Sequence, residues 1–73
     1  MTTRRVTAEV AGTVWKLAVA VGDQVAVDDP LIVIECMKME IPAASPWAGK
    51  VAAIHVAEGG LIEEGQLLVE LET

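Results

Sequence analysis

AGTVWKLAVAVGDQVAVDDPLIVIE, residues 11–35, and AGKVAAIHVAEGGLIEEGQLLVELE, residues 48–72, are two versions of one pattern. They align without a gap at an offset of 37 residues, and eight of the aligned pairs are identical. The identities fall mainly on glycines and small or branched aliphatic residues, the positions where backbone conformation and packing leave least freedom. Two halves of this length are too few and too short for a solenoid. The sequence therefore predicts a pseudo-twofold domain in which each half covers the apolar face of the other.

Each half has the pattern of β-strands. Residues 13–19 and 50–56 are rich in β-branched residues, and no apolar stripe with a helical period is sustained anywhere. Glycines and prolines separate the apolar runs. About four short strands per half predict an all-β fold, a small antiparallel sandwich or flattened barrel. Alternation in the last strand predicts that Leu67, Val69 and Leu71 face inward. The repeat places Ile32, Ile34 and Cys36 on the matching inner face, unless a bulge shifts them.

The composition predicts one small domain. We assign residues 1–73 to it, with a first half of about 7–37 and a second half of about 39–73. The chain is 53% hydrophobic but has no Phe or Tyr, so its core must be a thin one of Val, Ile, Leu and Ala. The single cysteine excludes an internal disulfide, and no His or Cys pair has the spacing of metal ligands. No structural metal is expected.

The charge and hydropathy exclude several kinds of partner. The formal net charge is −6 and no basic patch offsets it, which argues against nucleic-acid binding. No segment approaches the roughly 20 apolar residues that span a bilayer, and the N-terminal residues do not form a secretory signal. We therefore expect a soluble, cytoplasmic protein without a membrane partner. Its turns carry solubilising acids, at Asp28, Asp29, Glu58, Glu63 and Glu64.

Lys38 lies at the junction of the two halves, in the run Glu35-Cys36-Met37-Lys38-Met39-Glu40. In the second half the strand that ends at Glu72 runs into the C-terminus. The equivalent strand of the first half continues past Lys38 into a return strand over residues 39–45. We expect Lys38 at the tip of a tight hairpin, at the pole opposite the chain termini. Pro42 predicts that the return strand lies at a sheet edge or that it ends there.

Three interpretations of Lys38 compete. The first is an ordinary solvated lysine in a turn. The second is a catalytic amine, which would need a pocket and neighbours that depress its pKa. A barrel filled by its own side chains has no room for such a pocket, and no acid–base partners cluster nearby. The third is a covalent attachment point, which needs an exposed amine, a rigid hairpin and flanking side chains that a modifying enzyme can recognise.

A set of motifs surrounds Lys38 along the chain, namely Glu35-Cys36-Met37-Lys38-Met39, Gly22-Asp23-x-Val25, Leu31-x-x-Ile34, Pro46-x-x-Gly49-x-Val51, Gly59, Gly65 and Leu68. With these motifs the sequence resembles the biotinyl domain of biotin-dependent carboxylases over roughly residues 7–72, and in length it is most similar to stand-alone biotin/lipoyl attachment proteins. The resemblance implies a flattened antiparallel β-barrel or sandwich of two four-stranded sheets. No insertion is present of the kind that forms the protruding thumb of some carriers.

The resemblance also implies a function. A biotin protein ligase would biotinylate Lys38, with Met37 and Met39 as the flanking recognition pair and with Glu35 near the ligase contact. Biotin would then carry a carboxyl group between the biotin carboxylase and the carboxyltransferase of an acyl-CoA-type carboxylase. The chain would be a carrier rather than an enzyme, with no catalytic residue of its own. Lipoate is the alternative cofactor, but related lipoyl domains usually have Asp where this chain has Met37.

Several residues leave alternatives open. Cys36 stands where the family commonly has Ala, and it is either a small core residue or a redox-active thiol. Asp28 replaces a usual glycine, and we expect it to adopt the left-handed backbone that this turn requires. Trp15 and Trp47 are either surface-packing aromatics or contacts for a partner. A docking contact at Trp47 would be compatible with an unmodified adaptor protein. His55 is placed mid-strand and has no second ligand nearby in the sequence.

Overall fold

Eight β-strands form the regular structure of residues 2–73, the part of the chain that the computed structural model describes. No helix occurs among these residues. The strands are β1 (Thr3–Thr7), β2 (Gly12–Leu17), β3 (Gln24–Val25), β4 (Pro30–Cys36), β5 (Met39–Ala44), β6 (Gly49–Ile54), β7 (Leu61–Ile62) and β8 (Leu67–Glu72). The predicted runs 13–19 and 50–56 are thus strands that end two residues earlier, at Leu17 and Ile54.

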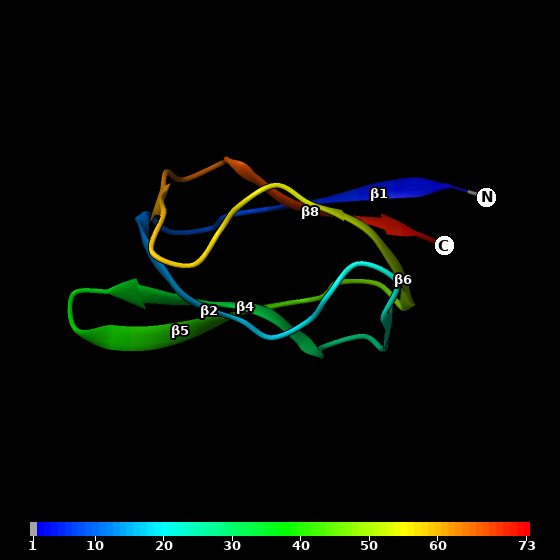
Figure 1. The fold of residues 1–73 in the computed structure, drawn as a ribbon, viewed down its shortest axis with the longest axis horizontal. Coiled ribbons are helices and arrows are strands. Elements are labelled where there is room, and N and C mark those ends of the chain that lie inside the picture. The colour runs from blue at the N-terminus through cyan, green and yellow to red at the C-terminus, as the bar shows by residue number, and fades with distance from the viewer. Residues whose placement is uncertain (1) are drawn as a thin grey trace.

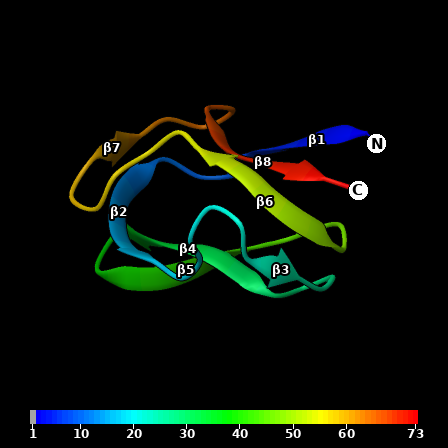
Figure 2. The same cartoon turned by 45° about the vertical axis from the view of Figure 1, so that its right-hand side comes forward.

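The strands form two four-stranded antiparallel sheets, in the orders β1-β8-β6-β3 and β5-β4-β2-β7 (Figures 1 and 2). Each sheet takes two strands from each half of the sequence. The short strands show this exchange most directly, because β3 of the first half pairs with β6, and β7 of the second half pairs with β2. The predicted all-β, pseudo-twofold sandwich is confirmed.

The domain is elongated, with extents of 36 × 17 × 17 Å. The two termini lie at one end of the long axis, and the hairpin that joins β4 to β5 lies at the other (Figure 1). The strand β5 is an edge strand, as Pro42 predicts, since a proline in a central strand would remove a ladder hydrogen bond.

The buried hydrophobic residues of the core are all aliphatic, and the predicted inward-facing residues are only partly right. Leu31 and Leu68 are fully buried, although alternation placed both on the outer face. Each is the extra residue of a β-bulge. The register of β4 against β5 skips Leu31, and the register of β1 against β8 skips Leu68. A bulge breaks the two-residue period, so these side chains turn inward, while Cys36 and Leu67 are only partly buried.

Two glycines set how closely the strands approach one another. A Cβ built on Gly12 would lie 2.4 Å from the carbonyl oxygen of Glu35, and one on Gly49 would lie 2.5 Å from that of Glu72. These are the same contact in the two halves. The twofold also pairs Asp28, at a φ of 73°, with Gly65, at 85°. Asp28 therefore adopts the predicted left-handed conformation.

Ser45 is the buried polar side chain of the core, and its twofold equivalent is Ala8. The Ser45 hydroxyl donates to the Trp47 carbonyl at 2.6 Å and accepts from the Trp47 N–H at 3.4 Å. The Ser45 backbone exchanges hydrogen bonds with the turn at Asp28 and Asp29, at 2.7 and 2.8 Å. These contacts fix the chain as it passes from β5 toward Trp47.

His55 lies just after β6 rather than in mid-strand. Its Nε2 is 2.7 Å from a carboxylate oxygen of Glu70, at the surface, which gives it a partner that the sequence did not predict. Trp15 is half exposed, and it occupies the bulge of β2 against β4. Trp47 packs against the core with the guanidinium of Arg4 over its ring, 5.5 Å from the ring centroid.

Replacing Gly12 or Gly49 by alanine tests the close strand approach. Each substitution should lower the free energy of unfolding by about 2 kcal/mol or more, because the new methyl group would force two paired strands apart. Urea denaturation measures this change. Ala11→Ser, an exposed neighbour, is the control and should stay within about 0.5 kcal/mol of the parent. Equal stability of the parent and Gly12→Ala would contradict the prediction.

Ser45→Ala should destabilise the domain by about 1–2 kcal/mol, because the buried backbone groups of Trp47 lose their hydrogen-bonding partner. Thermal unfolding followed by circular dichroism measures the loss. Thr3→Ala removes an exposed hydroxyl from β1 and serves as the matched control. An unchanged melting temperature for Ser45→Ala would show that the hydroxyl does not stabilise this segment.

Candidate functional site

The tip of the β4–β5 hairpin is a two-residue turn. Cys36 pairs with Met39, which leaves Met37 and Lys38 as the connecting residues. Both have left-handed backbones, at φ values of 53° and 64°. Two consecutive positive φ values are the signature of a type I′ turn, whose twist matches that of paired strands. Glycine or asparagine usually fills these positions, since left-handed backbone costs other residues about 1–2 kcal/mol each.

The side chains of the tip are presented to solvent. Met37 is 89% exposed and Met39 is 65% exposed, and Lys38 is exposed between them. The one ion pair within residues 2–73 joins His55 and Glu70, so no carboxylate lies within ion-pair distance of the Lys38 amine. The amine is therefore accessible to a large modifying enzyme.

The structure brings together all five residues that the sequence assigned to the site. Cys36 is the last residue of β4 and is partly buried, so it is neither a full core residue nor an open thiol. Glu35 is exposed and pairs across the hairpin with Glu40. Because side chains alternate along a strand, these two carboxylates lie on the face opposite Cys36 and Met39. The tip thus combines an apolar sulfur-containing side with an acidic side.

The twofold shows why Lys38 is distinct from the other lysines. The position equivalent to this turn lies at the opposite pole, where Thr2 and Thr73 exchange backbone hydrogen bonds of 3.1 and 2.9 Å. At that pole the paired strands are β1 and β8, which carry the two chain termini. Lys16 and Lys50 lie within the regular strands β2 and β6, beside neighbours in the sheet. Lys38 is the lysine that protrudes from a chain reversal.

The described residues offer no alternative centre of metal chemistry. No group of three or more His, Cys, Asp or Glu side chains among residues 2–73 could hold a metal ion. No helix capable of crossing a membrane is found in the same residues.

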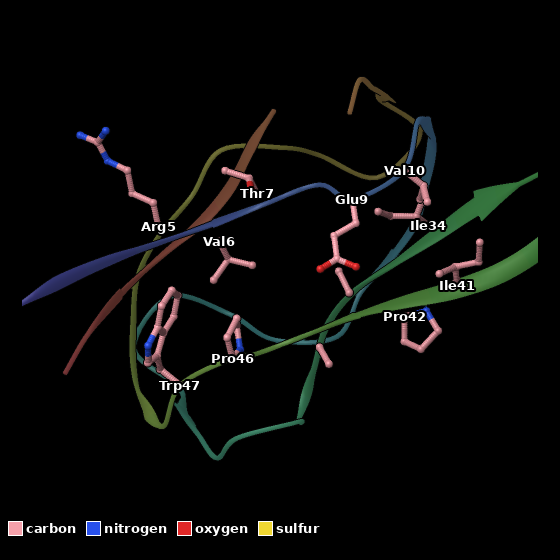
Figure 3. Close-up of a pocket in the computed structure, with 12 residues that line it drawn as sticks. Arg5, Val6, Thr7, Glu9, Val10, Ile34, Ile41, Pro42, Pro46 and Trp47 are labelled. Carbon is pink, nitrogen blue, oxygen red and sulfur yellow. The ribbon is translucent and has the colours of Figure 1, made fainter. Parts of the chain in front are cut away.

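A groove of about 350 Å³ between the edge strands β1 and β5 is a feature that sequence reasoning missed (Figure 3). Its lining comes from equivalent positions of the two halves, with Ile34 and Ile41 in addition. One side has Arg5, Val6, Thr7, Glu9 and Val10, and the other has Pro42, Ala43, Ala44, Pro46 and Trp47. The signal in the sequence was the chemical mismatch of the aligned pairs Glu9/Pro46 and Val10/Trp47. A mismatch marks a place where the halves differ in chemistry, but it does not reveal a concave surface.

Comparison with known proteins agrees with this geometry. The family described as "Biotin-requiring enzyme" matches residues 4–71. The biotin/lipoyl attachment protein of Bacillus subtilis is 38% identical over 66 residues, which cover 90% of each chain. The biotin carboxyl carrier protein of Streptococcus mutans is 41% identical over 64 residues, which cover 88% of this chain and 49% of that protein.

A solved structure gives the same result. The urea carboxylase of Kluyveromyces lactis superimposes with a TM-score of 0.93 and 33% identity, over 99% of this chain and 6% of that enzyme. The chain therefore matches a small part of that carboxylase and 90% of the length of the Bacillus subtilis attachment protein. From its sequence, its fold and its exposed tip lysine, the chain belongs to the biotin-requiring enzyme family of biotin/lipoyl attachment domains.

Proposed function

We propose that this chain is a biotin carboxyl carrier in which a biotin protein ligase acylates the ε-nitrogen of Lys38. The observation that carries the proposal is the position of Lys38, an exposed amine in a two-residue turn at the pole opposite the chain termini. The names of the relatives support biotin as the cofactor. The resident cofactor supplies the carboxyl-carrying chemistry.

The residues of this chain bind and present the cofactor. The paired strands β4 and β5 hold the Lys38 backbone in one conformation, which makes the tip a rigid mount for a long flexible arm. A tethered cofactor meets each partner site at a high effective concentration, so the carrier needs no catalytic group. Met37 and Met39 offer a soft apolar surface on both sides of the amine, which suits recognition by a ligase.

The partners we propose are the biotin carboxylase and carboxyltransferase components of a biotin-dependent carboxylase. The support is the likeness to urea carboxylase, in which a domain of this fold occupies 6% of the chain. An acyl-CoA-type carboxylase is the assembly that we expect from the sequence resemblance. The cytoplasmic location expected from the sequence stays a prediction.

Lipoate is the second candidate cofactor, since the Bacillus subtilis relative is named for both biotin and lipoyl attachment. The attachment residue would be the same. Co-expression with a biotin protein ligase or a lipoate ligase, each with its cofactor supplied, separates the two by the mass of the adduct. Quantitative lipoylation without biotinylation would replace biotin by lipoate in the proposal.

Lys38→Arg should abolish modification completely, because the guanidinium keeps the charge but is not acylated by a biotin ligase. Intact-mass spectrometry after co-expression with the ligase should show one biotinyl addition on the parent and none on the variant. Lys16→Arg and Lys50→Arg are matched controls and should remain fully biotinylated. Modification that persists in Lys38→Arg would overturn the assignment. Absence of any adduct on the parent chain from its native host would instead favour an unmodified adaptor.

Met37→Ala and Met39→Ala should each lower the kcat/KM of biotinylation by about ten-fold, the size expected when one exposed contact residue is truncated in a recognition surface. A fixed-time assay with purified ligase and labelled biotin measures the rates. Val27→Ala removes an exposed apolar side chain that lies outside the tip, and it should leave the rate unchanged. If all three variants are modified at the parent's rate, the methionines take no part in recognition.

A further inference from the structure

The groove between β1 and β5 is mostly apolar on both walls. The β1 side carries Val6, Val10 and Glu9, and the Arg5 side chain on this side points away from the groove (Figure 3). The opposite side carries two prolines and Trp47. The Glu9 carboxylate points into the space between the walls (Figure 3). Across residues 2–73 this carboxylate has no hydrogen bond and no ion pair. An acceptor without a partner thus faces an apolar surface.

The backbone before Glu9 is held in place. The N–H of Ala8 donates to the Gln66 carbonyl at 2.9 Å, and the Ala8 carbonyl accepts from the Gly65 N–H at 2.8 Å. Ala8 itself is buried in the core. The position of Glu9 over the groove is therefore set by the fold, and only its side chain is free to adjust.

One end of the groove opens toward the hairpin tip. Ile41 lines the groove and lies three residues from Lys38 along β5, a distance of about 10 Å at the rise of an extended strand. Ile34 pairs with Ile41, and Cys36 pairs with Met39 on the same face of the hairpin. A biotinyl-lysine side chain extends about 14 Å from its Cα to the ring, judged from ordinary bond lengths. The ring can therefore reach the end of the groove.

We propose that the biotin ring carried on Lys38 docks in this groove, with its ureido N–H groups donating to the Glu9 carboxylate. The fused ring packs against Ile41 and Pro42, the accessible apolar lining nearest the tip. A volume of about 350 Å³ lies within the range of small-molecule sites. This inference rests on the proposed biotinylation of Lys38.

Glu9 also determines which form of the ring the groove holds. A ring that carries a carboxyl group has one ureido N–H fewer and one negative charge more. That charge would lie beside the Glu9 carboxylate in a protein whose formal net charge is already −6. The groove therefore retains the unloaded cofactor and repels the loaded one, which leaves the loaded arm free to reach the next enzyme.

Comparison of the unmodified and biotinylated proteins by NMR tests the docking. With isotope-labelled protein, nuclear Overhauser contacts should connect the biotin ring protons to the side chains of Ile41 and Pro42. The amides of Glu9 and Val10 should also shift on biotinylation. Contacts and shifts confined to residues 36–40 would overturn the inference.

Variants identify the role of the carboxylate. In biotinylated Glu9→Ala the ratio of docked to undocked ring should fall about ten-fold, because hydrogen bonds to a charged acceptor are lost. Glu40→Ala is the matched control, since Glu40 lies two residues from Lys38 but does not line the groove. Equal loss in both variants would show a general charge effect and contradict the proposal.

Intact mass separates the carrier function from the docking of the ring. A missing adduct refutes the carrier function, whereas a complete adduct without groove contacts refutes only the docking.

Discussion

The exchange of strands between the two halves is the interaction on which the rest of the structure depends. Neither half can close a sheet alone, because β3 completes the sheet that contains β6, and β7 completes the sheet that contains β2. Reciprocal backbone hydrogen bonds fix this exchange, from Gly22 to the Val51 carbonyl and from Gly59 to the Val14 carbonyl, both at 2.8 Å. A thin core of aliphatic side chains without a disulfide needs such mutual closure.

The same exchange creates the functional tip. Because β4 belongs to the first half and β5 to the second, the connection between them must reverse the chain at one pole of the domain. At the other pole the equivalent connection is missing, and the paired ends at Thr2 and Thr73 take its place. The left-handed conformations of Met37 and Lys38 are tolerated because the register of the flanking strands leaves two residues to turn the chain.

The symmetry is broken chemically where the edge strands face each other. Equivalent backbone positions form both walls of the groove, yet the first half places a carboxylate where the second half has a proline. Ser45 shows the same principle inside the core. It takes the position of Ala8 and uses its hydroxyl to hold the segment that carries Trp47. A duplicated backbone therefore supports two different sets of side-chain roles.

The repeat, the all-β class and the location of Lys38 at a hairpin tip could be predicted from the sequence, and Pro42 limited its strand to a sheet edge or an early end. These follow from local spacing, since glycines, prolines and alternating apolar residues act on the backbone near them. The sequence did not determine that Leu31 and Leu68 are buried, because a bulge depends on the register against a partner strand that is remote in the sequence. The pairing of His55 with Glu70 and the groove that Glu9 enters likewise depend on the tertiary fold. Each of them requires segments from distant parts of the chain to meet, and no local pattern specifies where those segments lie in space.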